Sequence, residues 1–194
     1  MEIGATKAVQ DRLKTTKIEE SKGASLVFCW DTHLTKIKGR NVLFIVNASN
    51  RYTIAMTDIE PRNWNYYTMY IRSVIHGVMQ EMGYSEDQIG QYFKISGDTT
   101  VTKTHGRKSV GGINRMVMDA QYFGKKLEKE AKYQWELSEY LNRDICQPEG
   151  FDAYGYPSEL FKLDMERLGI ISKRKPAKII DFTQYIDTNR STNH

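Results

Sequence analysis

The residues best suited to chemistry lie in segment 99–114, TTVTKTHGRKSVGGIN, where a β-branched run passes through a basic turn into a helical pattern. Lys103 and Arg107 would lie beside the exposed N–H groups of the first helical turn, and the Ser109 hydroxyl would suit the N-cap. Such a turn can bind an anionic group, although an ordinary turn with solvated basic residues explains the pattern equally well. The segment contains neither GxxxxGK[ST] nor GxGxxG, so it is not a nucleotide-binding fingerprint.

A second candidate is Asp31-Thr32-His33, because strand alternation would place Asp31 and His33 on one face. A carboxylate and an imidazole at this spacing can share a proton, hold a metal or bind a polar ligand. Metal sites need three or four protein ligands, and no third ligand stands nearby in the sequence, so we expect neither a metal nor a cofactor. The absence of a GxSxG motif also argues against a Ser-His-Asp hydrolase.

The elements that must position these residues begin with strands. A short strand at 2–5 and a helix at 7–13, capped by Thr6, open the chain. Three further strand candidates, at 25–37, 42–46 and 52–57, are joined by short turns. This spacing predicts an antiparallel meander with the strand near Thr99 as a further member.

Helical periodicity dominates the rest of the chain. Apolar residues three or four apart predict a helix over 62–82, a shorter one over 85–92, and a long one from Ile113 that continues to about Asn142. We therefore expect an α+β fold, in which an antiparallel sheet of four or five strands has its two main helices packed on one face.

The clearest boundary is Gln147-Pro148-Glu149-Gly150, which predicts an α+β core domain at 1–146 and a C-terminal appendage at 147–194. The appendage should contain a short helix and pack back on the core through four aromatic residues, Phe151, Tyr154, Tyr156 and Phe161.

Composition describes an ordinary globular protein of 194 residues, with 27% charged and 40% hydrophobic residues, a net charge of +4 and a pI near 8.9. This charge permits a nucleic-acid partner without requiring one. The sequence contains neither a stretch typical of a signal peptide nor one that could span a bilayer, which predicts a cytoplasmic protein without a membrane partner. Two cysteines without CxxC spacing indicate a reducing compartment.

Three blocks of the chain together resemble one family: IGATKAVQDRL, WDTHLTKIKGRNVLFIVN and KTHGRKSVGGIN. They are similar to an uncharacterised bacterial domain of unknown function whose members read TKKLL, WHANLL, LFVN and KTxxRSVLGSMN. The resemblance covers roughly residues 3–127. In the second block, the family's His corresponds to Asp31 and its Asn to His33, and in the third its Ser corresponds to Lys108.

The resemblance marks polar residues that a core does not need. Its pattern corresponds here to Thr6, Lys7, Trp30, Leu34, Asn47, Lys103, Thr104, Arg107, Gly111 and Asn114. We expect a polar pocket in which Lys103, Arg107 and the helix N-terminus hold an anion. The proposed ligand-binding set is Lys7, Asp31, His33, Asn47, Lys103, Thr104, Arg107, Ser109 and Asn114.

The favoured function is non-enzymatic binding of nucleic acid or of a protein partner through the basic turn. The protein would then be a bacterial or phage regulatory protein that originates from a mobile element or from a host-conflict system. The alternative is a metal-independent phosphodiesterase or ribonuclease-like enzyme. In that case His33 or His105 would act as general base while Lys103 and Arg107 stabilise phosphoryl oxygens.

Overall fold

The computed structural model describes residues 1–14 and 18–172, and within them five strands form one sheet in the order β4-β3-β2-β1-β5. The strands are β1 (Glu2–Ala5), β2 (Cys29–Ile37), β3 (Arg40–Asn47), β4 (Thr53–Thr57) and β5 (Thr100–Thr102). The helices are α1 (Lys7–Leu13), α2 (Pro61–Asn65), α3 (Tyr67–Glu81), α4 (Glu86–Ser96), α5 (Gly106–Gln121), α6 (Trp135–Asn142) and α7 (Pro157–Arg167), with a 3₁₀ turn at Leu26–Phe28. The predicted α+β class is confirmed.

The strands β2, β3 and β4 form the predicted antiparallel meander. β1, however, pairs in parallel with both β2 and β5, so the sheet is mixed, and the expectation of an entirely antiparallel sheet is wrong. The reason lies in the connections, since β1 reaches β2 by way of α1, and β5 follows the helices α2 to α4. Crossover connections of this kind join parallel strands, whereas tight turns join antiparallel ones.

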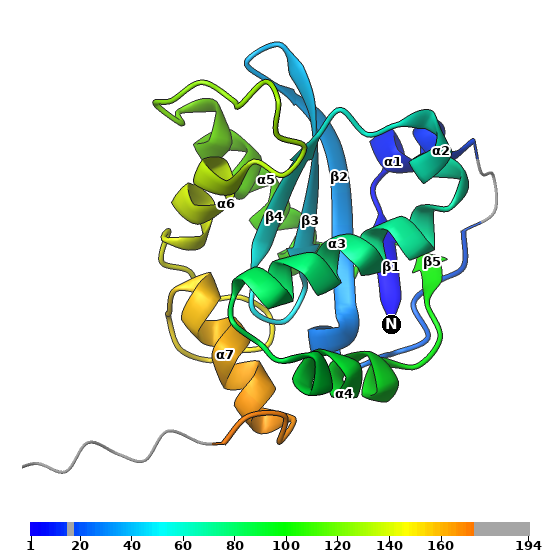
Figure 1. Ribbon diagram of the computed structural model, residues 1–194, viewed down its shortest axis with the longest axis vertical. Helices are drawn as coiled ribbons and strands as arrows, with labels where there is room; N and C mark the ends of the chain where they lie inside the picture. The colour runs from blue at the N-terminus through cyan, green and yellow to red at the C-terminus, as the bar shows by residue number, and fades with distance from the viewer. Residues whose placement is uncertain (15–17, 173–194) are drawn as a thin grey trace, which may run out of the picture.

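Helices cover both faces of the sheet, with α3 across one face and α5 behind it (Figure 1). The prediction that the two main helices share one face is therefore wrong. β3 explains why, because its apolar residues alternate between two cores: Leu43 and Ile45 pack in the core of α3, and Val42 and Phe44 in that of α5. A strand that is apolar on both sides needs a cover on each.

Two predicted helices are shorter than expected. The helix predicted over 62–82 is divided at Tyr66 into α2 and α3, and the helix predicted to reach Asn142 stops at Gln121. The segment after α5 instead follows the free edge of β4, where Thr57 N–H donates to the Lys132 carbonyl at 2.8 Å. Among the described residues, we find no helix with the length and apolar character required to cross a bilayer.

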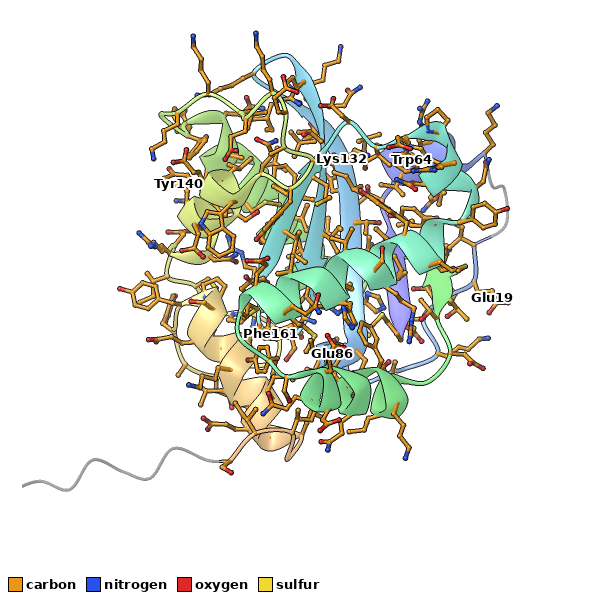
Figure 2. The ribbon with its side chains drawn as sticks, in the orientation of Figure 1. Glu19, Trp64, Glu86, Lys132, Tyr140 and Phe161 are labelled. Carbon is orange, nitrogen blue, oxygen red and sulfur yellow. The ribbon has the colours of Figure 1, made fainter. Side chains whose placement is uncertain are left out.

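The helix α7 packs into the same core as α3. Phe161, labelled in Figure 2, is fully buried and contacts Trp30 and Tyr52, with ring centroids 6.0 and 5.4 Å apart. Of the other aromatic residues predicted to pack here, Phe151 is buried, whereas Tyr154 and Tyr156 are exposed. The boundary at residue 147 stays a prediction, and residues 173–194 of the predicted appendage lie outside the described part of the chain.

Candidate functional site

A buried polar cluster lies where β1, β2 and the start of α5 meet. It contains Glu2 of β1, Asp31 of β2, His105 at the N-cap position of α5, and Ser109 in the first turns of that helix. The alternating strand geometry explains its place, since Ile3 and Trp30 belong to the core of α3 and their sequence neighbours point to the other face. The side chains of Glu2, Asp31 and His105 are 5%, 0% and 3% exposed, so water contributes little to their solvation.

The imidazole of His105 joins two carboxylates. Its Nδ1 lies 2.7 Å from Asp31 Oδ1, and its Nε2 lies 3.0 Å from Glu2 Oε2. The backbone N–H of His105 also donates to both Asp31 oxygens, at 3.2 and 3.3 Å, and the Ser109 hydroxyl donates to Asp31 Oδ2. Because both ring nitrogens face carboxylate oxygens, this geometry fits an imidazolium that donates from each nitrogen.

Surrounding groups adjust the ionisation of the cluster. Burial alone would lower the pKa of His105, but hydrogen bonds and charge interactions with Asp31 and Cys29 outweigh it and raise this pKa to about 10. For Glu2, burial would raise the pKa, but hydrogen bonds from Ser21, from the Lys22 backbone and from His105 leave it lowered. The Ser21 hydroxyl donates to Glu2 Oε2 at 2.6 Å, and Lys22 N–H donates to Oε1 at 2.8 Å.

Gly4 makes room for the cluster. A Cβ at this position would lie 1.9 Å from Asp31 Oδ1 and 3.0 Å from the Thr104 Cα. The Asp31 carboxylate is fixed by donors from His105 and Ser109, so it cannot easily move aside. A side chain on β1 at this point is therefore incompatible with the observed packing.

The carboxylate of Asp31 occupies the place that the sequence assigned to an external anion. It lies against the backbone N–H that precedes α5 and accepts the Ser109 hydroxyl. The prediction that Ser109 caps the helix is wrong, because His105 holds the N-cap position and the Ser109 side chain donates to Asp31. An internal carboxylate thus takes the role that a bound phosphate would have.

Two of the predicted ligand-binding residues, Asn47 and Ser109, line one hollow beside Lys108 and Arg51, but its volume is only about 40 Å³. Cavities that bind small molecules are typically about 300 Å³ or more, whereas 40 Å³ is on the scale of single water molecules. The Asn47 amide is also used internally, since it donates to the Val27 carbonyl at 2.9 Å and accepts from Ser49 N–H at 3.0 Å. This hollow is therefore too small for the predicted anion pocket.

The other predicted site residues lie outside the buried polar cluster. Lys103 pairs with Glu20 at the surface, and Lys7 pairs with Asp11 at 2.8 Å. His33 Nδ1 lies 3.2 Å from Thr6 Oγ1, and burial lowers the pKa of its imidazole. Thr104 is half-buried beside His105, and Arg107 and Asn114 are exposed on α5. The structure therefore brings Asp31 and Ser109 together and leaves the rest of the predicted set outside the cluster.

Sequence reasoning missed Glu2 and Cys29 as companions of His105. One potential ligand atom from each of these three residues lies within 4.8 Å of the other two. Glu2 and Cys29 are direct partners in the parallel register of β1 and β2. No sequence spacing reveals this register, but the isolated Glu in an otherwise apolar opening strand is a signal that could have drawn attention to it.

A larger cavity of about 430 Å³ lies elsewhere, beside the turn between β2 and β3. Its lining includes Arg12, Arg40, Asp58 and Trp64. Arg12 lies over the Trp64 ring at 5.5 Å, and Tyr67 stacks with the same ring at 5.6 Å. The Trp64 ring of this cavity is thus already in contact with two residues of the same chain. None of the predicted site residues lines the cavity.

Comparison with known proteins assigns the chain to a family. The sequence profile of a domain of unknown function, DUF6933, matches residues 2–160. The chain belongs to this family. The predicted membership of a family of unknown function is confirmed, and the DUF6933 match extends beyond the predicted residue 127 through α6 into α7. No curated protein and no solved structure matches the chain.

Proposed function

We propose that this DUF6933 protein binds nucleic acid through the exposed face of α5, which would lie along the phosphate backbone. The observation that carries this proposal is the charge of that face. α5 contains three cations, Arg107, Lys108 and Arg115, against one acidic residue, Asp119. All three cations are exposed, whereas the apolar side of the helix, with Ile113 and Met116, is buried against the sheet.

No other described helix carries as large an excess of positive charge. α6 contains two glutamates and no cation, and α4 contains Glu86 and Asp87 against Lys94. Because the chain as a whole is only mildly basic, its positive charge is concentrated on this helix relative to the others. Basic residues gathered on one helix face are the electrostatic signature expected of a nucleic-acid contact.

Further features of α5 suit an extended polyanion. Its 16 residues span about 24 Å, a length over which duplex DNA presents many phosphates. Beyond the cations, exposed Asn114 can donate and accept hydrogen bonds, and Met118 and Tyr122 are 59% and 80% exposed. Exposed Lys125 and Lys126 follow directly. The helix therefore offers charge, hydrogen bonding and an aromatic ring along one side.

The inner side of α5 supports the proposed contact with phosphates, because it holds the helix in place on the sheet. Asp31 accepts hydrogen bonds from His105 and Ser109 and so joins the start of α5 to β2. A surface that contacts phosphates gains affinity when its groups are already fixed in position.

The geometry gives less support to the phosphodiesterase alternative. A general base needs a free nitrogen lone pair within reach of the substrate, and both ring nitrogens of His105 face carboxylates inside the protein. His33, the other predicted base, lies against Thr6, and the Lys103 ammonium pairs with Glu20. We therefore keep binding as the proposed function.

The test is binding of fluorescent duplex DNA, single-stranded DNA and RNA, measured by anisotropy at several salt concentrations. The variant Arg107→Gln/Lys108→Gln/Arg115→Gln removes the three cations of α5. The control, Lys14→Gln/Arg62→Gln/Lys94→Gln, removes the same charge from exposed positions outside α5. Thermal unfolding of both variants checks that the fold is retained.

We expect the α5 variant to lose most of its affinity and the control to bind as the wild type does. The slope of log K against log salt should become shallower by about 0.9 for each phosphate contact removed. Absence of binding by the wild type to all three probes would refute the proposal. Equal losses in the two triple variants would also refute it, because they would indicate a response to net charge rather than to this face.

A further inference from the structure

We infer that Glu2, Cys29 and His105 form a binding site for a divalent transition-metal ion, with zinc as the best match to the donor set. Their carboxylate oxygen, sulfur and imidazole nitrogen lie within 4.8 Å of one another. All three residues are buried, and they come from β1, β2 and the start of α5. This inference is independent of the proposed binding of nucleic acid, which concerns the opposite side of α5.

The donor types and their spacing suit a small tetrahedral ion. Zinc binds thiolate, imidazole and carboxylate at about 2.0–2.3 Å, which places its ligand atoms roughly 3.3–3.8 Å apart. His105 Nε2 and Glu2 Oε2 are 3.0 Å apart, so a small outward shift of these side chains would admit the ion. Three protein ligands leave one coordination position for another group, as in known zinc sites of this ligand number.

The groups around the three ligands are arranged as an outer coordination shell. Asp31 lies 2.7 Å from Nδ1 of His105, which leaves Nε2 directed at Glu2 and toward the metal position. A carboxylate on the second nitrogen is the usual companion of a metal-bound histidine, because it fixes the tautomer and the ring orientation. Ser109 in turn holds Asp31, and Ser21 holds Glu2.

The charge of the cluster is compatible with a bound dication. Metal ligation requires thiolate and neutral imidazole, so binding displaces the protons that these groups carry. The two carboxylates of Glu2 and Asp31 are both buried beside the ion and balance its charge.

The Cys29 thiol lies close to both other proposed ligands, since its Sγ is within 4.8 Å of the ligand atoms of Glu2 and His105. Its protein hydrogen bonds go to backbone carbonyl oxygens, those of Ala24 at 3.7 Å and Ser25 at 3.5 Å. The second cysteine, Cys146, is also buried, but it packs with Phe151 and Leu160 in an apolar cluster. Cys146 therefore serves as a matched internal control.

The test is titration of the full chain with Co²⁺, a spectroscopic substitute for zinc, after treatment with reductant and chelator. We expect saturation at one equivalent, with ligand-field bands of a tetrahedral site and a sulfur-to-cobalt charge-transfer band that added Zn²⁺ abolishes. Cys146→Ser should retain the charge-transfer band, whereas Cys29→Ser should lose it. Glu2→Gln should keep the band and require more Co²⁺ for saturation.

The wild type and Cys146→Ser decide the result even if Cys29→Ser does not fold. The chain has two cysteines, so a charge-transfer band retained in Cys146→Ser identifies Cys29 as the sulfur ligand. A folded wild type that takes up no Co²⁺ would overturn the inference, and so would a charge-transfer band that persists in folded Cys29→Ser. Neither result bears on nucleic-acid binding by α5.

Discussion

The two sides of the segment from Lys103 to Arg115 differ in how their polar residues are used. On the inner side, His105 and Ser109 are engaged with Asp31 and Glu2 in a cluster closed to solvent. On the outer side, Arg107 is exposed, and Arg115 pairs with Asp119, one helical turn away at 3.1 Å. One short segment thus supplies both internal support and a charged surface, and residue type alone does not separate the two roles.

The difference has an energetic consequence. Removal of one partner from a buried ion pair leaves an uncompensated charge and costs about 3–5 kcal/mol. An exposed pair contributes about 0–1 kcal/mol, because water and salt solvate both partners well. Substitutions on the inner side should therefore change stability, whereas substitutions on the outer side should change binding.

The largest expected effect comes from Asp31→Asn, which removes the charge that faces Nδ1 of His105. We expect the free energy of unfolding to fall by about 3–5 kcal/mol in urea denaturation, with chelator present so that no metal contributes. The control is Asp11→Asn, which removes the carboxylate of an exposed pair with Lys7 and should cost at most about 1 kcal/mol. Similar losses in the two variants would contradict the contrast between the two sides.

A smaller loss is expected from Gly4→Ala, which tests the packing of the cluster without altering charge. The new Cβ would meet Asp31 Oδ1 at 1.9 Å, so we expect destabilisation by about 1–3 kcal/mol. Gly77→Ala is the matched control, because Gly77 lies in α3 and no atom of the described residues comes within 4 Å of the added Cβ. That change should stabilise the protein by about 0.5–1 kcal/mol. A neutral Gly4→Ala variant in the same urea denaturation would show that Asp31 can move.

Much of the fold could be predicted, because it follows local patterns. The opening strand, α1 and the meander match the predicted positions closely, and the shorter helix predicted over 85–92 is found as α4. Prediction from the sequence was wrong where tertiary contacts determine the structure. The charged segment after α5 has the residue pattern of a helix, but its backbone pairs with the edge of β4. Likewise, only the apolar character of both sides of β3 could indicate helices on two faces.

The candidate site was harder to predict, because its members meet through strand register. Asp31 and Ser109 were predicted from residue type, but Glu2 and Cys29 become neighbours only when β1 pairs with β2 in parallel. The sequence pattern of each strand leaves its partner undetermined. For the same reason, a helix start with Ser109 and basic residues resembles an anion site until a carboxylate from β2 is found to fill it.

The smallest expected effect concerns His33, which lies on the same strand as Asp31 but outside the cluster. Its neighbour is the Thr6 hydroxyl, and burial lowers the pKa of its imidazole below the usual 6.5. The imidazole of His33 therefore binds a proton less readily in the folded protein than in the unfolded chain. Stability from this residue should be fully present above about pH 6.5 and decrease as the pH falls through the pKa of folded His33.

The measurement is an NMR titration of the His33 ring signals, together with the free energy of unfolding between neutral and mildly acidic pH. His33→Gln should remove part of the decrease in stability on acidification, and His76→Gln, at a surface histidine beside Glu86, provides the comparison. A pKa for His33 at or above its usual value would contradict the prediction. Such a result would mean that a carboxylate reaches His33 in solution, and the polar cluster would then extend further along β2 than Asp31.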